Sequence, residues 1–359
     1  MSPGAGSANP AMRRPFRTAV LALGASGAFG FLVSACVQHP RVAAPPSGGT
    51  PRTEAVVPTG LETGSGLLRR VPLGLDLFMP IPEDNPLTVE RIELGRRLFH
   101  DQRLSRDRSL TCASCHDPRR AFSGRQPRAI GVFGRTGRRN APALLNRGYG
   151  RAFFWDGRMP TLEAQVLQPI QDVNEMDLPL DEAAARVGLD IESISQALAS
   201  YVRSIFSGDS PYDRFVNGNG TALSRQQQEG LRIFRGKGNC TTCHVGPTLS
   251  DEEFHNTGVA WRDGQFQDEG RAAVTRNPRD RGAFKTPTLR EVALTAPYMH
   301  DGSFRRLEEV VAFYDEGGRP NPRLDPDLRP LGLTAVERRA LVAFLRSLSG
   351  SIQEGVPRP

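Results

Sequence analysis

Two copies of the pattern Cys-x-x-Cys-His contain the residues of this chain best suited to chemistry. Two thiols at this spacing form thioether bonds with the vinyl groups of a haem, and the adjacent His then lies under the iron. A zinc ribbon would need its second Cys pair about 15–20 residues from the first, but more than a hundred residues separate the copies. A thioredoxin-like redox pair would not need His after both. We therefore predict two covalently bound haem c groups, attached through Cys112, Cys115, His116, Cys240, Cys243 and His244.

The remaining His residues bear on whether each haem iron has a sixth ligand. An electron carrier needs both axial positions filled, whereas a peroxidase needs one haem with an open face. Between His116 and His244 there is no His, and Met159 and Met176 are the only thioethers there. His100 precedes the first copy and either folds back as a ligand or serves as a polar helix-end residue. The pattern favours an open first haem.

The N-terminus resembles an export signal. Three Arg precede an apolar stretch from Ala19 to Val33, which is too short and Gly-rich for a permanent spanning helix. The stretch ends in Val-Ser-Ala-Cys36, which resembles a bacterial lipoprotein box. The alternative is cleavage nearby with Cys36 left as a free thiol. We expect residues 1–35 to be a signal peptide and Cys36 to carry a lipid anchor to a bacterial membrane, by default the outer one.

Composition and charge limit the partners. The formal charge of +7 becomes 7 − 3 = +4 once the three Arg of residues 1–35 are removed. The other Arg are spread along the chain without interleaved aromatics, so no nucleic-acid partner is expected. We expect these Arg residues to pair with the carboxylates of a cofactor and to attract an acidic electron-donor protein. Residues 36–70 are rich in Pro, Gly, Ser and Thr and predict a flexible tether.

Helical periodicity recurs along the rest of the chain. Apolar spacing and caps predict helices over 88–98, 191–206, 224–234 and 334–348. No convincing hairpin series is present, and Gly and Pro are frequent. The predicted fold is mainly α and loop-rich, with two cytochrome c-like helical domains, each holding one haem. Their expected ranges are 71–222, a peroxidatic haem domain, and 223–352, an electron-transfer haem domain, followed by a tail over 353–359.

Six short motifs occur in one order along the chain: Leu94–Phe99, Arg103–Ser105, Cys112–His116, Arg139–Pro142, Phe154–Arg158 and Ala296–Gly302. Together they resemble the bacterial di-haem cytochrome c peroxidases. The same superfamily includes the di-haem enzyme that matures the tryptophan tryptophylquinone of methylamine dehydrogenase. The resemblance covers roughly residues 80 to 350 and implies an N-terminal peroxidatic haem, a C-terminal electron-transfer haem and a Ca²⁺ ion at the domain interface.

The resemblance also implies roles for single residues. Trp155 matches an electron conduit between the haems, although a lone Trp is more often a core residue. Gln165 and Glu175 match the pair that handles peroxide: the carboxylate moves a proton between the two oxygens and the amide orients the substrate. Without the resemblance, Gln165 is a solvated helix residue and Glu175 a cap. Asn140, Thr295 and Pro297 match the calcium ligands, the last two through backbone carbonyls.

The chain departs from the classical members of the family that it resembles at two places. Their distal His, in the loop after the first motif, has no counterpart in the stretch from Ala129 to Arg138. The second haem's usual Met position is Tyr314, as in the tryptophylquinone-maturing enzyme. Tyr314 also shares a helical face with Leu307, 310 and 311. The alternative is a core Tyr, with Met299 or His300 as the ligand. A His/Tyr haem would have a low reduction potential.

These observations together predict a cytochrome-c peroxidase-type oxidoreductase in the periplasm. It would reduce hydrogen peroxide to water with electrons from a small donor protein, a cytochrome c or a cupredoxin. A homodimer is compatible with the resemblance. One alternative is a maturase-like enzyme that oxidises Trp or Tyr residues of a partner protein through a high-valent di-haem state. The other is a di-haem electron-transfer cytochrome without a substrate.

Overall fold

The long helices lie where periodicity and capping residues predict them, in a computed structural model that describes residues 60–63 and 66–356. Thr88, Ser224 and Thr334 cap three of these helices, because each side chain accepts a hydrogen bond from a backbone N–H in the first turn. The helix expected over 191–206 ends at Arg203, because the following residues enter a strand. The helices are α1 (Val89–Phe99), α2 (Cys112–Cys115), α3 (Leu162–Val166), α4 (Gln168–Gln171), α5 (Leu180–Val187), α6 (Ile191–Arg203), α7 (Pro211–Val216), α8 (Arg225–Arg235), α9 (Ala272–Thr275), α10 (Leu307–Asp315) and α11 (Ala335–Arg346).

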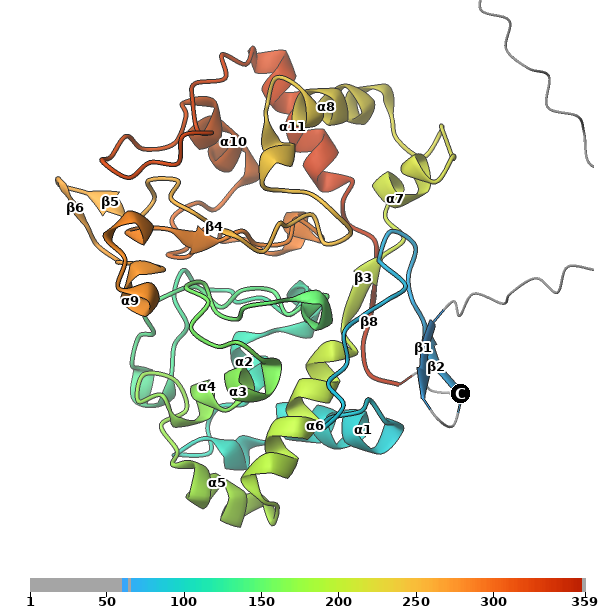
Figure 1. The fold of residues 1–359 in the computed structure, drawn as a ribbon, viewed down its shortest axis with the longest axis vertical. Coiled ribbons are helices and arrows are strands. Elements are labelled where there is room, and N and C mark those ends of the chain that lie inside the picture. Colours follow the sequence, from blue (N-terminus) through green and yellow to red (C-terminus); the bar gives the residue numbers. More distant parts are fainter. Residues whose placement is uncertain (1–59, 64–65, 357–359) are drawn as a thin grey trace, which may run out of the picture. The chain divides into compact units, whose positions relative to one another are not determined.

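Two helix crossings organise the packing, α1 against α6 and α8 against α11 (Figure 1). Each crossing is close because one helix presents a glycine. A Cβ at Gly95 of α1 would overlap the carbonyl oxygen of Ala197 in α6. A Cβ at Gly230 of α8 would likewise overlap the carbonyl oxygen of Ala340 in α11. The two halves of the chain therefore use the same device to bring their longest helices together.

The strands are short and form two-stranded antiparallel sheets. One of them, β3–β8, joins segments far apart in sequence, since Phe206 is paired with Gln353. The segment predicted as a tail over 353–359 therefore begins inside a strand, which corrects that boundary. The strands are β1 (Gly60–Thr63), β2 (Gly66–Arg70), β3 (Phe206–Gly208), β4 (Phe254–His255), β5 (Trp261–Arg262), β6 (Gln265–Phe266), β7 (Phe284–Lys285) and β8 (Ser351–Gln353).

Two large hydrophobic clusters and one small one fill the interior. The first large cluster draws its buried residues from Val71 to Phe206 and the second from Leu223 to Leu348. The small cluster (Phe153, Leu162, Ala199 and Val202) lies within the first of these ranges. This division falls at the predicted boundary between residues 222 and 223, yet residues 56–359 form one compact unit. The structure confirms a helical, loop-rich fold. The assignment of one haem domain to each large cluster stays a prediction.

Of the residues predicted to form the signal peptide and the tether, the structure describes only 60–63 and 66–70. The tether predicted over 36–70 differs from the structure, because β1 and β2 pair as an antiparallel hairpin. The signal peptide over 1–35 and the lipid site at Cys36 lie outside the described residues. Within the described part, no helix is both long and apolar enough to cross a bilayer.

Candidate functional site

The first Cys-x-x-Cys-His copy folds into one helical turn, α2. The Thr111 N–H donates to the Ser114 hydroxyl at 3.0 Å, and the His116 N–H donates to the Cys112 carbonyl at 2.9 Å. Both cysteines are free thiols. Burial raises the pKa of Cys112 to about 12 and that of Cys115 to about 11. Such thiols are protonated at neutral pH, so this turn is not built for thiol–disulfide exchange.

The His116 imidazole has one nitrogen fixed by the backbone. Its Nδ1 lies 3.1 Å from the carbonyl oxygens of both Phe122 and Pro142. Carbonyls only accept hydrogen bonds, so Nδ1 carries the proton and Nε2 keeps its lone pair. Burial lowers the pKa of His116, which keeps the ring neutral. This is the tautomer and orientation that an iron ligand needs.

The second copy repeats this arrangement. The His244 N–H donates to the Cys240 carbonyl at 2.9 Å, and Nδ1 lies 2.9 Å from the Leu249 carbonyl oxygen. Burial lowers the pKa of His244 and raises that of Cys240 to about 12. The two predicted haem ligands, His116 and His244, therefore have the same tautomer, with Nδ1 protonated and Nε2 unprotonated.

These donor sets fit haem c. Each copy offers two unpaired thiols and a neutral imidazole, which are the groups that attach the porphyrin and bind its iron. A buried nitrogen atom of Arg120 also favours a bound haem. Arg120 donates from Nη2 to the Ala296 carbonyl at 2.5 Å, but its buried Nε has no hydrogen-bond partner within the described part of the chain. A carboxylate such as a haem propionate would satisfy that N–H.

Glu175 lies in the turn between α4 and α5, close to the first Cys pair. Its charge contributes to the raised pKa values of Cys115 and Cys112. Burial, and then the charge of Asp172, raise the pKa of Glu175 to about 7, while Arg158 lowers it. Among the described residues the carboxyl group has no hydrogen-bond partner. An unpaired carboxyl that titrates near neutrality can both accept and return a proton.

Gln165 lies on α3, the short helix that precedes this turn. The helix is held against α6, since Arg203 forms an ion pair with Glu163 at 2.6 Å and is itself buried. The Gln165 side chain is partly buried and, within the described part, forms no hydrogen bond. Its amide therefore remains available, which suits an orienting role on a fixed scaffold.

The loop from Ala129 to Arg138 packs on the backbone of Glu175. The Val132 N–H donates to the Glu175 carbonyl at 2.8 Å. Gly131 has no room for a Cβ, which would overlap the Asn174 carbonyl oxygen. The loop from Ala129 to Arg138 thus lies beside Glu175, and it contains no His. The structure also places His100 at the exposed end of α1, where its N–H donates to the Arg97 carbonyl.

Trp155 connects segments from both halves of the chain. Its Nε1 donates to the Asn140 carbonyl at 2.9 Å, and its own carbonyl accepts the Lys285 N–H at 2.8 Å. The Asn140 N–H in turn donates to the His300 carbonyl at 2.7 Å. These bonds tie the segment that carries the indole to residues of both halves of the chain.

The predicted calcium ligands come from both halves of the chain, Asn140 from the first and Thr295 and Pro297 from the second. Asn140 is buried and donates from Nδ2 to the Gln126 carbonyl at 3.0 Å, so its Oδ1 is left as an acceptor. The carbonyls of Thr295 and Pro297 accept no backbone hydrogen bond from any described residue. Three oxygens without donors are the type of ligand that Ca²⁺ takes.

Tyr314 lies on α10 near the second Cys pair. Burial raises the pKa of its hydroxyl, and the charges of Cys243 and Cys240 add to this effect. The hydroxyl has no hydrogen-bond partner among the described residues. The alternative ligand His300 stacks on Phe284 with ring centroids 3.6 Å apart, and burial lowers its pKa to about 4. This stacking occupies one face of the His300 ring.

Sequence reasoning missed a cluster beside the second motif. His255 contacts Asp325 through Nδ1 at 2.6 Å and Asp251 through Nε2 at 3.0 Å. Hydrogen bonds to Cys243, Asp325 and Asp251 raise the pKa of His255 to about 10. Cys243, Asp251 and His255 are close enough to share a metal ion. A thioether at Cys243 would remove the thiolate from that set. The i, i+4 spacing of Asp251 and His255 was the available signal.

Buried ion pairs also cross between the halves. Arg147 forms a bidentate pair with Glu252 at 2.8 and 2.9 Å, and Lys285 lies 3.3 Å from the same carboxylate. Arg139 pairs with Asp156 at 2.6 Å and Asp268 at 2.8 Å. These bonds hold the segment around Trp155 against β7.

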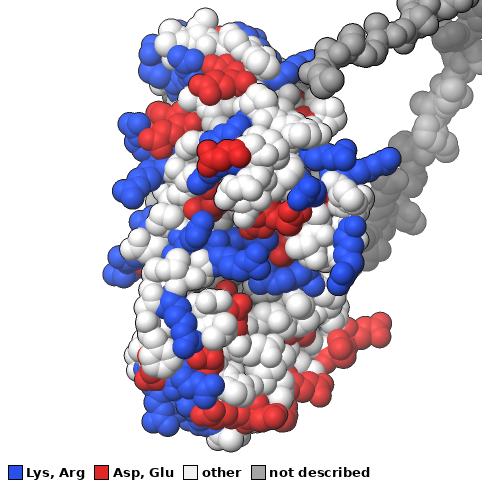
Figure 2. All heavy atoms as spheres, turned by 90° about the vertical axis from the view of Figure 1, so that its left-hand side faces the viewer, with Lys and Arg blue, Asp and Glu red and all other residues white. Residues whose placement is uncertain are grey.

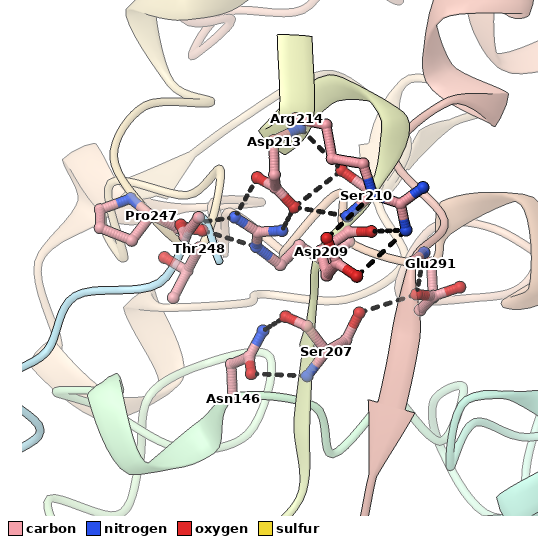
Figure 3. A network of polar contacts seen from close by, with 12 residues as sticks. Asn146, Ser207, Asp209, Ser210, Asp213, Arg214, Pro247, Thr248 and Glu291 are labelled. Atoms are coloured by element: carbon pink, nitrogen blue, oxygen red, sulfur yellow. Dashed lines mark hydrogen bonds and ion pairs between the residues drawn. The ribbon is translucent and has the colours of Figure 1, made fainter. Parts of the chain in front are cut away.

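A further buried network surrounds Asp213 at the start of α7 (Figure 3). Arg290 donates to both Asp213 carboxylate oxygens at 2.8 and 3.0 Å, to the Pro247 carbonyl at 2.6 Å and to the Gly74 carbonyl at 2.7 Å. Both charged side chains are 1% exposed. Because Pro247 follows His244 by three residues, this ion pair fixes the loop after the second motif.

The charged surface is uneven. Figure 2 shows the face that carries β5, β6 and α9, where Lys and Arg gather in a band across the middle. Arg276 and Arg279 follow α9 in the chain, are exposed and have no carboxylate partner within the described part of the chain. This face presents unneutralised positive charge.

Comparisons with known proteins agree with this arrangement. A family model for di-haem cytochrome c peroxidase matches residues 89–221. Cytochrome-c peroxidase IdrP2 of Denitromonas iodatirespirans is 36% identical over 313 residues, covering 75% of this chain and 84% of the relative. Methylamine utilization protein MauG of Methylorubrum extorquens is 37% identical over 288 residues, covering 75% and 81%. The crystal structure of a MauG-like protein associated with microbial copper homeostasis has 33% identity and a TM-score of 0.69, covering 76% and 93%.

The chain belongs to the di-haem cytochrome c peroxidase family. Two Cys-x-x-Cys-His turns, each with a neutral imidazole, define an oxidoreductase of this family, and membership implies covalently bound haem c. The family predicted from the six motifs is thereby confirmed.

Proposed function

We propose that the protein reduces hydrogen peroxide to water with electrons from a donor protein, at the haem bound by His116. The reaction breaks the O–O bond and consumes two protons and two electrons, so that two one-electron donors are oxidised for each peroxide. The observation that supports this most directly is Glu175: an unpaired carboxyl group beside the first Cys pair, with a pKa of about 7.

The residues around the first motif then have distinct roles. A haem attached to Cys112 and Cys115 would supply the iron that binds and reduces peroxide. Glu175, as carboxylate, would accept a proton from one peroxide oxygen and return it to the other, so that the second oxygen leaves as water. Gln165 orients the substrate with its free amide. The loop from Ala129 to Arg138 provides no His that has to be displaced first.

The residues around the second motif would pass electrons to the first haem and hold the two halves of the chain together. Tyr314 and His244 are the proposed ligands of the second haem, and Trp155 is the proposed conduit. Asn140 Oδ1 and the carbonyls of Thr295 and Pro297 would hold Ca²⁺, which would fix the segment that accepts the Trp155 hydrogen bond. A periplasmic location with a lipid anchor at Cys36 completes the proposal.

The test is peroxide consumption by the holoprotein with a small-molecule one-electron donor. Glu175→Gln should lower the rate by about 10²–10⁴-fold while both haems stay attached. Glu253→Gln is the matched control, because Glu253 is exposed and its side chain has no partner among the described residues. Equal rates for the two variants would remove Glu175 from the mechanism. No peroxide consumption by the wild type would favour a pure electron-transfer cytochrome.

Tyr314 favours a second candidate, the oxidation of Trp or Tyr residues on a partner protein. Its position beside the second Cys pair matches the expectation for a maturase-like enzyme, and one relative is a methylamine utilization protein. Mass spectrometry of candidate partner proteins, incubated with the holoprotein and peroxide, tests this. A mass change at a specific Trp or Tyr would support it. Turnover with a donor protein and no such change would favour the peroxidase.

A further inference from the structure

The loop after the second motif holds a carbonyl group against His244 by contacts that the mechanism above does not use. Leu249 supplies this carbonyl, whose oxygen lies 2.9 Å from His244 Nδ1. Leu249 has a φ of 52°, in the left-handed region that is unfavourable for a residue with a Cβ. Its side chain is buried in the second large hydrophobic cluster. A residue persists in such a conformation only where the surrounding contacts hold it there.

The residues on either side of Leu249 are fastened by side-chain hydrogen bonds to the segment that follows β7. The Thr288 hydroxyl donates to the Thr248 carbonyl at 2.5 Å. The Ser250 hydroxyl donates to the Thr286 carbonyl at 2.7 Å. Ser250 and Thr286 are buried, so water does not compete for the second bond. The backbone is thus held on both sides of Leu249, and these two bonds fix the direction in which its carbonyl points.

The segment that provides these contacts is itself fixed. The Lys285 N–H donates to the Trp155 carbonyl at 2.8 Å, and the Thr286 N–H donates to the Glu253 carbonyl at 2.9 Å. At its other end Arg290 forms the buried ion pair with Asp213. The hydroxyl of Thr288 therefore acts from a rigid support, and a change at this one atom is transmitted to the loop beside His244.

The first motif orients its imidazole differently. His116 Nδ1 faces two carbonyls, and one of them belongs to Phe122, which also has a left-handed φ of 55°. The Phe122 N–H donates to the Asp117 carbonyl at 2.9 Å, and the Ser123 hydroxyl donates to the Arg120 carbonyl at 2.6 Å. The Phe122 carbonyl is thus fixed within the turn of the first motif, whereas the Leu249 carbonyl is fixed from a separate segment.

We infer that Thr288 and Ser250 are positioning residues for the second haem: by holding the Leu249 carbonyl against His244, they lower the reduction potential of that haem. A hydrogen bond from Nδ1–H to a carbonyl makes the coordinating Nε2 more basic, which stabilises oxidised iron. A low potential also favours transfer of an electron from the second haem to the first. The inference rests on the part of the proposed function that assigns His244 to the second haem, and not on peroxide turnover.

The test is a spectroscopic redox titration of the holoprotein, without peroxide or a donor protein, that gives the reduction potential of each haem. Thr288→Val keeps the shape of the side chain but removes the hydrogen-bond donor, whereas Thr288→Ser keeps the donor. Ser250→Ala removes the other hydroxyl and gives an independent measurement. Its matched control is Ser195→Ala in the first half, because Ser195 is also buried and donates to the Glu163 carbonyl at 2.8 Å.

The expected change is confined to one haem. Cys240→Ala/Cys243→Ala lacks the second attachment and identifies the signals of the first haem. In Thr288→Val and in Ser250→Ala the reduced form of the second haem should be favoured about tenfold, which raises its potential by about 59 mV for one electron. The first haem should keep its potential, and both haems should match the wild type in Thr288→Ser and in Ser195→Ala.

Several results would overturn the inference. Unchanged potentials with a lowered Tm would mean that the two hydroxyls only stabilise the loop. Equal shifts at both haems, or a shift in Thr288→Ser as large as that in Thr288→Val, would also overturn it. A wild type that binds only one haem would overturn it together with the ligand assignment of the proposed function. The predicted shift in a protein without peroxide turnover would support the inference and refute the proposed function.

Discussion

The pH dependence of the reaction with peroxide should report the ionisation of Glu175. Its pKa is raised to about 7, first by burial and then by Asp172, and the proposed mechanism needs the carboxylate. For a group with this pKa, the ionised fraction rises from about 0.09 at about pH 6 to about 0.91 at about pH 8. The second-order rate constant for peroxide should therefore rise about tenfold across this range.

Stopped-flow mixing of the resting holoprotein with peroxide measures this rate constant directly. The Glu175→Gln variant should be slow and nearly flat over the same range. Two neighbours should move the inflection in opposite directions. Asp172→Asn removes a negative charge and should lower the pKa, whereas Arg158→Gln removes a positive charge and should raise it. Opposite shifts cannot come from a general loss of stability.

Another titrating group could produce a similar profile, and Lys285 is the one to test. Burial lowers the pKa of Lys285 to about 8. Lys285→Met should leave the inflection near pH 7 in place. The reasoning is refuted if Glu175→Gln keeps the wild-type inflection, or if Asp172→Asn moves it to higher pH.

Three further predictions concern stability and metal binding. Arg290→Met leaves the Asp213 carboxylate buried without its partner and should lower the free energy of unfolding by about 3–5 kcal/mol in urea titrations, whereas Arg214→Met, at an exposed pair, should not change it measurably. Tyr314→Phe should alter the absorption spectrum of the second haem and leave that of the first unchanged; an unaltered spectrum would favour Met299 or His300. After treatment with EGTA, added Ca²⁺ should raise the Tm of the wild type but not of Asn140→Ala, and equal increases would contradict the proposed site.

Much of the fold could be predicted from the sequence, because it depends on local signals. Thr88, Ser224 and Thr334 cap helices within one residue of the expected starts. The two helix crossings could have been predicted as well. Each contains the pattern Gly-x-x-x-Phe, Gly95 to Phe99 and Gly230 to Phe234, ahead of its Cys pair. This repeat indicates two related helical units.

The pairing of β3 with β8 could not be predicted, since nothing local connects residues more than a hundred positions apart. The same holds for the ionic contacts of the site. Arg147, Glu252 and Lys285 look like ordinary surface residues in the sequence, and only the tertiary structure buries them together. Motifs could therefore predict the haem ligands, but they could not predict which charges surround Trp155.

The β3–β8 pairing sets an order of assembly. Gln353 pairs with Phe206, the Tyr201 hydroxyl donates to Glu354 at 2.8 Å, and the Gly355 N–H donates to Ser204 at 3.1 Å. All these partners at the end of α6 are synthesised some hundred and fifty residues before the strand that covers them.

Without residues 351–355 the end of α6 lacks these partners. A chain cut after residue 350 would contain both Cys pairs and every proposed catalytic residue. It would still lack the strand that covers the end of α6. The packing of the first half around α6 therefore depends on a strand from the far end of the second half.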